Sequence, residues 1–384
     1  MTEKLYYEDQ YMRKFTANVI SCEKEKNNYR VVLDRTAFFP EGGGQPGDRG
    51  ILQNSEICVN VSDTQIENDV IYHICDKEIS GNIEGILNWD FRFDNMQQHT
   101  GEQIFTGFVH NEKGYDNVGF HIGENEVTID FNGPVTKEEI DAFEIMANNA
   151  IYRNIPVDII LPKTEELKNY DYRSKKELTG QVRLVKIGDI DLCACCGTHL
   201  KRTGEVGLIK VQWFENYKGG VRIHLKTGNR ALRDFQQKTD SVNNISALLC
   251  AKTDEVTDAV EKLKEKNSKE KQAYNELKNK FYSLLCENVS DDLPLAFDDT
   301  NNSEDARILA DMLAEKHKIA FAFSGTDETG YKYAVISRTE DVREIGKNLN
   351  KALNGRGGGR PEMIMGSAMC KKEEIKASGA ELLN

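Results

Sequence analysis

Residues 192–208 read Leu-Cys-Ala-Cys-Cys-Gly-Thr-His-Leu-Lys-Arg-Thr-Gly-Glu-Val-Gly-Leu, and within them Cys195 and His199 stand four residues apart. On a tight turn that runs into a helix, this spacing would bring a thiolate sulfur and an imidazole nitrogen to one point. Sulfur and imidazole nitrogen are both good ligands for zinc. The stretch therefore predicts one half of a metal site.

A second half-site lies about a hundred residues earlier, in residues 98–105, which read Gln-His-Thr-Gly-Glu-Gln-Ile-Phe. His99 and Gln103 are at positions i and i+4, which share one face of a helix. A single histidine on a helix is ordinarily a hydrogen-bonded structural residue, and it is the second pair that favours ligation. Two pairs facing each other predict one four-ligand zinc pocket, formed by His99, Gln103, Cys195 and His199.

A glycine-rich segment precedes both half-sites: residues 36–48 read Thr-Ala-Phe-Phe-Pro-Glu-Gly-Gly-Gly-Gln-Pro-Gly-Asp. Three successive glycines do not suit a helix or the interior of a strand. Two interpretations remain open, a hairpin loop and a loop whose backbone approaches a ligand closely. In the second interpretation Thr36 and Gln45 supply polar contacts beside Gly42, Gly43 and Gly44.

Composition limits the class of protein. With 384 residues, 39% hydrophobic and 29% charged, the chain is long enough for two or three soluble domains. Its nine cysteines are odd in number, and three of them crowd together, which favours a reducing cytoplasm over a disulfide framework. We expect no signal peptide and no membrane segment. A net charge of −13 argues against indiscriminate nucleic-acid binding, so any RNA contact depends on local basic patches.

Hydrophobic periodicity predicts an α+β fold in four parts. Residues 1–90 have strand-length alternation and form a β-rich, barrel-like domain, and residues 91–234 add a layered α/β domain that begins with a helix. The spacing of apolar residues over 235–290 predicts a helical linker or coiled coil, although a helix packed on its own domain explains this spacing equally well. Residues 291–384 predict a small α/β unit.

Two basic regions are candidate RNA contacts. Residues 354–361 read Asn-Gly-Arg-Gly-Gly-Gly-Arg-Pro, and glycines that allow close approach beside arginines suit a phosphate backbone. A turn with solvated arginines is the alternative. The predicted contacts here are Arg356, Gly357, Gly358, Gly359 and Arg360. A second basic run ends the 91–234 domain, with Arg222 and Arg230 as its predicted contacts; it comprises Lys210, Lys218, Arg222, Lys226, Arg230 and Arg233.

Taken together and in order, these segments resemble the alanyl-tRNA editing proteins of the AlaX type, in the long form that carries the C-terminal DHHA1 domain of alanyl-tRNA synthetase. The resemblance covers nearly the whole chain. It rests on five segments: residues 36–48 as the Gly-rich loop, 98–105 as the HxxxH helix, 195–207 as the CxxxH block, 220–232 as the segment that closes the editing domain, and 355–361 as the DHHA1 signature.

The chain departs from the family pattern at position 103, where glutamine stands in place of the second histidine. An amide oxygen is a poor zinc ligand beside imidazole or thiolate. Gln103 could ligate weakly, or a water could complete a three-ligand site, which is also the usual form of a catalytic zinc. A third alternative is that Cys196 or His121 fills the position.

The resemblance implies a zinc-dependent deacylase that acts in trans on tRNA for alanine mischarged with serine or glycine. It implies catalytic roles for Thr36, Gln45, His99 and Gln103, with Thr36 bonding the serine hydroxyl and Gly42 to Gly44 shaping the pocket wall. tRNA is the expected partner. The linker and C-terminal domain leave a homodimer open.

Three other interpretations are weighed against the editing enzyme. A non-catalytic tRNA-binding or regulatory protein with a degenerate editing site would explain Gln103. A phosphoesterase that shares the DHHA1 domain is disfavoured, because the chain has no Asp-His-His triplet. A redox sensor built from Cys193, Cys195 and Cys196 has no support beyond the crowding of those cysteines.

Overall fold

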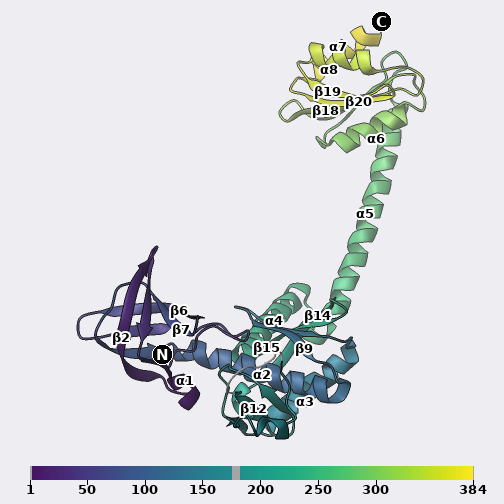
Figure 1. The fold of residues 1–384 in the computed structure, drawn as a ribbon. Coiled ribbons are helices and arrows are strands. Elements are labelled where there is room, and N and C mark those ends of the chain that lie inside the picture. Colours follow the sequence, from purple (N-terminus) through teal and green to yellow (C-terminus); the bar gives the residue numbers. More distant parts are fainter. Residues whose placement is uncertain (1, 175–181, 384) are drawn as a thin grey trace. The chain divides into compact units, whose positions relative to one another are not determined.

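The structure is a computed structural model that describes residues 2–174 and 182–383. It divides into two compact units, Met1–Asn244 and Ile245–Asn384 (Figure 1). Both units mix helices and strands, so the predicted α+β class is confirmed. The finer division into four domains stays a prediction.

The first unit begins with a six-stranded closed barrel. Alternate residues of β7 and β8 are buried, as expected for strands with one face toward a barrel interior, and closure leaves no unpaired edge. The interior is filled by apolar side chains such as Leu33, Leu52 and Val59. In barrel order the strands are β2 (Lys14–Glu25), β3 (Asn28–Leu33), β7 (Val70–Cys75), β6 (Cys58–Glu67), β5 (Gly50–Gln53) and β8 (Asn82–Leu87).

The helix α2 (Trp89–Lys113) leads from the barrel into the second layer of this unit (Figure 1). Asn88 caps its start by accepting a hydrogen bond from the Phe91 N–H, and Gly114 ends it in the left-handed conformation. Arg92, fully buried, forms an ion pair with Asp48 and also donates to two carbonyls near the barrel, Gln10 O at 2.8 Å and Ala37 O at 2.6 Å. These bonds fix the helix to the barrel.

The second layer contains two antiparallel sheets that share one apolar core with α2 and α3 (Lys137–Tyr152). A capping box at Thr136 and Glu139, with both of its hydrogen bonds present, starts α3. The larger sheet has the order β14 (Ile209–Tyr217), β15 (Gly220–Thr227), β10 (Val127–Phe131) and β9 (Asn117–Ile122). The smaller has the order β11 (Val157–Ile160), β12 (Leu184–Ile187) and β13 (Asp191–Ala194).

The spacing of Cys195 and His199 suggested a turn that runs into a helix, but the structure has no helix start at this segment. β13 ends at Ala194, and an irregular loop follows, up to the short 3-10 helix Thr203–Val206. The Cys195 N–H continues the pairing with the neighbouring strand by donating to Arg183 O at 3.0 Å, and the chain leaves the sheet after this bond. His99 lies on a helix as predicted, whereas its partners lie on a loop.

The second unit contains a five-stranded sheet and helices. Its strand order is β16 (Leu295–Asp298), β17 (Ala320–Thr326), β18 (Gly330–Ile336), β20 (Met363–Ala368) and β19 (Arg356–Arg360). Its helices are α5 (Val256–Glu287), α6 (Ser303–Leu313), α7 (Arg343–Ala352) and α8 (Lys372–Leu383). In the part of the chain that is described, none of the helices combines the length and apolarity needed to cross a membrane.

Two sequence predictions are corrected in residues 228–361. The helical segment predicted over 235–290 is not continuous: it consists of two helices, α4 (Gly228–Leu249) and α5, because the chain breaks at Cys250, whose φ is +49°. The expected glycine loop at 354–361 is largely strand β19, which pairs with β20 from Arg356 to Arg360. Glycine lowers strand propensity, but here the partner strand supplies the ladder.

Candidate metal centre

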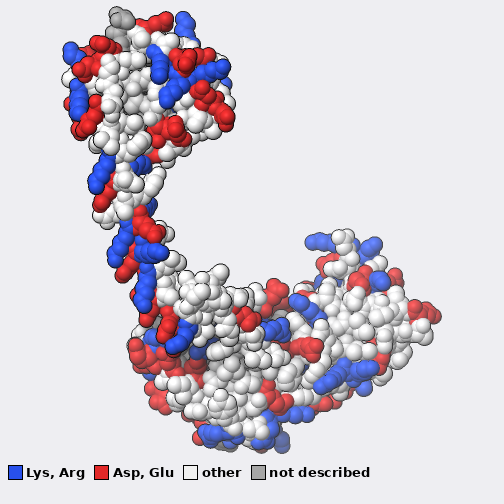
Figure 2. All heavy atoms as spheres, turned by 180° about the vertical axis from the view of Figure 1, so that it is seen from behind, with Lys and Arg blue, Asp and Glu red and all other residues white. Residues whose placement is uncertain are grey.

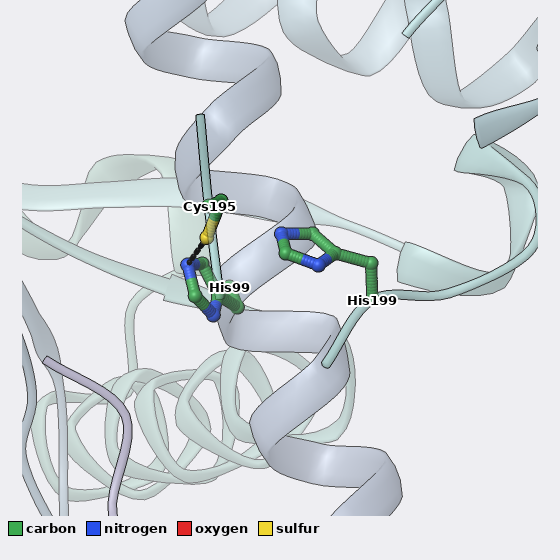
Figure 3. A group of neighbouring side chains, drawn as sticks. All are labelled: His99, Cys195 and His199. Carbon is green, nitrogen blue, oxygen red and sulfur yellow. Dashed lines mark hydrogen bonds between the residues drawn. The ribbon is translucent and has the colours of Figure 1, made fainter. Parts of the chain in front are cut away.

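Three strong metal donors come together in the first unit. His99 of α2 and Cys195 and His199 of the loop after β13 offer ligand atoms that all lie within 4.8 Å of one another (Figure 3). Cys195 Sγ is 3.3 Å from His99 Nε2, and the two imidazole ring centroids are 4.5 Å apart. Both histidines are buried. The structure thus joins the two half-sites that the sequence separates by about a hundred residues.

Gln45 determines how His99 presents its nitrogens. The Thr198 N–H donates to Gln45 Oε1 at 3.1 Å, which identifies this atom as the amide oxygen, and Gln45 Nε2 donates to Thr198 Oγ1 at 2.8 Å. The same oxygen lies 2.9 Å from His99 Nδ1. Since an amide oxygen can only accept, Nδ1 carries the proton, and the Nε2 lone pair faces Cys195.

His199 is oriented by its own loop. Its Nδ1 lies 3.0 Å from Gly197 O, a carbonyl that can only accept, so Nε2 carries the lone pair. Its backbone N–H donates to the side chain of Gln10, and the next N–H, of Leu200, donates to Thr100 Oγ1 at 3.0 Å. The loop is therefore held on the face of α2 that carries His99.

The glycine triplet forms a tight turn that supports this centre. Gly42 and Gln45 exchange two backbone hydrogen bonds of 3.0 and 3.1 Å, and Gly43 and Gly44 have φ values of +62° and +87°. Two positive φ values at the central positions suit glycine. Gly44 O accepts from Ile122 N at 2.8 Å, and the Phe120 ring packs against His99, with the ring centroids 4.9 Å apart and the planes tilted by 35°. The turn places Gln45 against His99.

The predicted fourth ligand also suits a cation. Gln103 is 2% exposed, and its Oε1 accepts no hydrogen bond from the described residues. A buried amide oxygen without a donor is costly unless something else binds it. Two imidazole nitrogens and a thiolate, with this oxygen one helical turn from His99, fit zinc by the chemistry of the donors.

The two alternative ligands lie outside the group of donors. His121 is exposed on β9. Cys196 is also exposed and contacts Tyr7 instead, where burial first and then the Cys196 thiol raise the pKa of the Tyr7 hydroxyl to about 12. The geometry therefore favours the three donors His99, Cys195 and His199 over an arrangement that includes either of these residues.

Arg183 is a residue of this centre that the sequence interpretation missed. Its Nη1 donates to Cys195 O at 2.7 Å and to Gly197 O at 3.1 Å, so the guanidinium fixes the ligand loop. The side chain is 7% exposed, and burial lowers its pKa. The signal was present, since an arginine interrupts the otherwise apolar run Val182-Arg-Leu-Val185.

Thr36 lies at the barrel, with its hydroxyl already bonded. His73 Nδ1 is 3.0 Å from the carbonyl of Val31, so His73 Nε2 must accept the Thr36 O–H, at 2.8 Å. Thr36 Oγ1 in turn accepts the Phe38 N–H at 3.1 Å. One lone pair of Thr36 remains for a further donor. Burial lowers the pKa of His73 to about 4.

The predicted RNA contacts differ in how far their charges are paired. Arg222 pairs with Asp130 at 2.6 Å, and Arg230 with Asp94 at 2.7 Å. Lys210 and Lys226 pair with Glu144 and Asp234. By contrast, Arg356 and Arg360 at the ends of β19 are exposed, and no ion pair joins them to the described residues. Figure 2 shows the two signs of charge interleaved over the face drawn.

Comparisons with known proteins agree with this architecture. The family described as tRNA synthetases class II (A) matches residues 2–87, and the threonyl and alanyl tRNA synthetase second additional domain matches residues 182–230. The alanyl-tRNA editing protein AlaX-L of Pyrococcus horikoshii is 33% identical over 98% of this chain and 96% of its own. The chain belongs to the AlaX family of alanyl-tRNA editing proteins.

Other relatives of this AlaX-family chain are complete ligases. The alanine–tRNA ligase of Pyrobaculum aerophilum is 34% identical over 72% of the chain, which spans a third of that ligase. The solved C-Ala domain of Aquifex aeolicus alanyl-tRNA synthetase is 24% identical over 23% of the chain, with a TM-score of 0.21, too low to establish a shared fold. The editing protein AlaX-L supports alanyl-tRNA editing as the process in which this AlaX-family chain takes part.

Proposed function

We propose that the protein is a trans-editing deacylase, which hydrolyses the ester of tRNA for alanine mischarged with serine or glycine. The observation that carries the proposal is the His99, Cys195 and His199 group, in which the bonds of both Nδ1 atoms turn both Nε2 lone pairs toward a ligand. Such editing answers a physical limit. A pocket sized for alanine rejects a smaller or hydroxylated side chain only modestly, so a second site must inspect the product.

His99, Cys195 and His199 would hold zinc, with Gln103 as a weaker fourth ligand. When bound, the ion would act as a Lewis acid toward the ester carbonyl or toward water. Gln45 is a positioning residue, because it holds the His99 tautomer. Loss of such a supporting hydrogen bond typically costs 10- to 100-fold in metal affinity or activity.

Thr36 would recognise serine by accepting a hydrogen bond from its hydroxyl, while the turn of Gly42 to Gly44 shapes the wall. The protein would act in the cytoplasm with tRNA as its partner. The strand Arg356–Arg360 of a DHHA1-like domain would bind part of the tRNA through its phosphates. Residues of the helices α4 and α5 that are exposed and apolar, such as Leu263 and Leu277, offer a surface for a homodimer or coiled coil.

The deciding experiment is deacylation of seryl- and glycyl-tRNA for alanine, with and without a chelator. We expect Cys195→Ala and His199→Ala to lose bound zinc together with at least about 100-fold of activity. Cys196→Ala is the matched control, since its thiol is exposed and outside the donor group. Activity that survives in Cys195→Ala, or resists the chelator, would contradict a metal-dependent mechanism.

The second candidate function is a tRNA-binding protein whose editing site no longer turns over. Gln103 in place of the family histidine is the observation in its favour. Tight tRNA binding without hydrolysis of either charged tRNA, in zinc-loaded protein, would identify this alternative.

A further inference from the structure

A cavity of about 690 Å³ opens beside the metal centre, within the first unit. It is joined to the centre by direct connections: Pro46 of its lining follows Gln45, and Ile122 of its lining donates to Gly44 O at 2.8 Å. Asp94 of the lining precedes His99 by five residues, which is roughly 7.5 Å along a helix. These connections place the cavity next to the residues that support His99.

The charges that line the cavity are of two kinds. Arg230 and Lys226 are neutralised by Asp94 and Asp234, with N–O distances of 2.7 Å in both pairs. Arg49 and Arg233 are both exposed, and neither has an ion pair with a carboxylate of the described residues. These two arginines are the cations in the lining whose charge remains available to a ligand.

The remaining lining favours a nucleotide over a plain anion. The Arg49 guanidinium lies over the Phe91 ring, 4.5 Å from its centre, so that ring supports a planar cation on whose other face a base can stack. Asp90 and Glu124 are exposed carboxylates that can accept from ribose hydroxyls or an exocyclic amine. The volume is within the range of ligand sites. A nucleotide carries all three features: a base, hydroxyl donors and a phosphate.

We propose that this cavity binds the unpaired 3′ end of the RNA substrate, with Arg49 and Arg233 contacting its phosphates. The inference rests on the proposed function, because it takes the aminoacylated end of a tRNA to be what reaches the metal centre. In this proposal the RNA contacts of the first unit are Arg49 and Arg233, whose charges are available. Arg49 was not singled out by the sequence pattern. Arg222 and Arg230, which the pattern did single out, are paired with carboxylates.

The test measures the affinity of the full-length chain for two uncharged RNA hairpins, by fluorescence anisotropy. One hairpin copies the acceptor stem of tRNA for alanine with its unpaired 3′ end, and the other lacks that end. Each of Arg49→Ala and Arg233→Ala should weaken binding of the first hairpin about fivefold at ~0.1 M salt. Each should also lower the slope of log affinity against log salt by about 0.7, the value for one phosphate contact on a single strand.

Arg153→Ala is the control, an exposed arginine outside the cavity. Wild type should bind the shortened hairpin more weakly, and the cavity variants should add little to that loss. Equal weakening of both hairpins, or none, overturns the proposal. Deacylation by the wild type, Arg49→Ala and Arg233→Ala is assayed separately. If all three hydrolyse charged tRNA equally well, this inference fails and the proposed function stands.

Discussion

The chain contains two glycine triplets with nearly the same surroundings in sequence, Gly42–Gly44 before Gln45-Pro46 and Gly357–Gly359 before Arg360-Pro361. The first is a tight turn with two positive φ values, pressed against Phe120 and supporting His99. The second is an exposed strand at the edge of a sheet, paired residue by residue with β20.

The difference shows that glycine permits a conformation and its neighbours select it. The first triplet is fixed from outside by Ile122 and by the buried Asp48 that ends its segment. The second has a partner strand on one side and exposed residues throughout. We expect substitutions around the first triplet to be costly, and those at Gly358 and Arg356, whose positions are open, to be mild. Two experiments test that contrast directly, and two more probe the buried region around the first triplet.

The largest effect should come from removing one arginine in each region. Arg92→Ala leaves Asp48 buried without its partner, and we expect a loss of about 3–5 kcal/mol in the free energy of unfolding. Arg356→Ala removes an exposed side chain and should change stability by less than about 0.5 kcal/mol.

Both tryptophans of the chain, Trp89 and Trp213, lie in the first unit, so their fluorescence during denaturant unfolding reports on Arg92→Ala there. Circular dichroism follows Arg356→Ala. Similar losses in the two variants would remove the contrast.

Alanine substitution of one glycine in each triplet comes next. At Gly44 a Cβ would lie 2.5 Å from Phe120 O with φ at +87°, whereas at Gly358 nothing lies within 4 Å. We expect Gly44→Ala to cost roughly 2–4 kcal/mol and to weaken zinc binding, because the Phe120 ring packs against His99. Gly358→Ala should be nearly neutral. A neutral Gly44→Ala, by the same fluorescence measurement, would show that the turn can relax.

Acid should act on the buried region through His73. Its pKa is about 4 in the folded chain and 6.5 in the unfolded one, so between these values the unfolded state binds more protons. Stability is therefore complete above pH 6.5 and falls as the pH drops toward 4, by up to about 3 kcal/mol. His73→Gln, which cannot titrate, should show a flatter pH profile than wild type. The exposed His121→Gln serves as control, and identical slopes in all three proteins would exclude His73 as the cause.

The smallest of the four effects is a gain. Gln103→His restores the family's second histidine on the face of α2 that carries His99, and we expect zinc to bind about tenfold more tightly, equal to about 1.4 kcal/mol. Competition with a chromogenic chelator measures this affinity. Gln236→His, at an exposed position of α4, controls for an added imidazole. Affinity unchanged in Gln103→His would mean that residue 103 does not face the ion.

Local patterns in the sequence predicted much of the fold. Alternation indicated the β-rich region of residues 1–90, and the spacing of His99 and Gln103 indicated a helix at those two residues, because both signals depend on neighbours within a few residues. The sequence did not predict the break at Cys250 or the strand at Arg356. Both depend on packing rather than on propensity, because the break lies within a charged helical stretch and the strand consists largely of glycines.

For the candidate site, the sequence by itself determined the donor types and their pairing in two half-sites, because the chemistry of histidine and cysteine is local. The tertiary structure alone decided which atoms of these residues are available to bind a metal ion. Gln45 and Gly197 select the Nε2 lone pairs, Arg183 fixes the loop, and Asp130 and Asp94 neutralise arginines that the sequence presents as free. The physical reason is that, apart from the local bond of His199 to Gly197, these tautomers and ion pairs depend on contacts between residues 12 to 136 positions apart. A linear pattern carries no signal for such contacts.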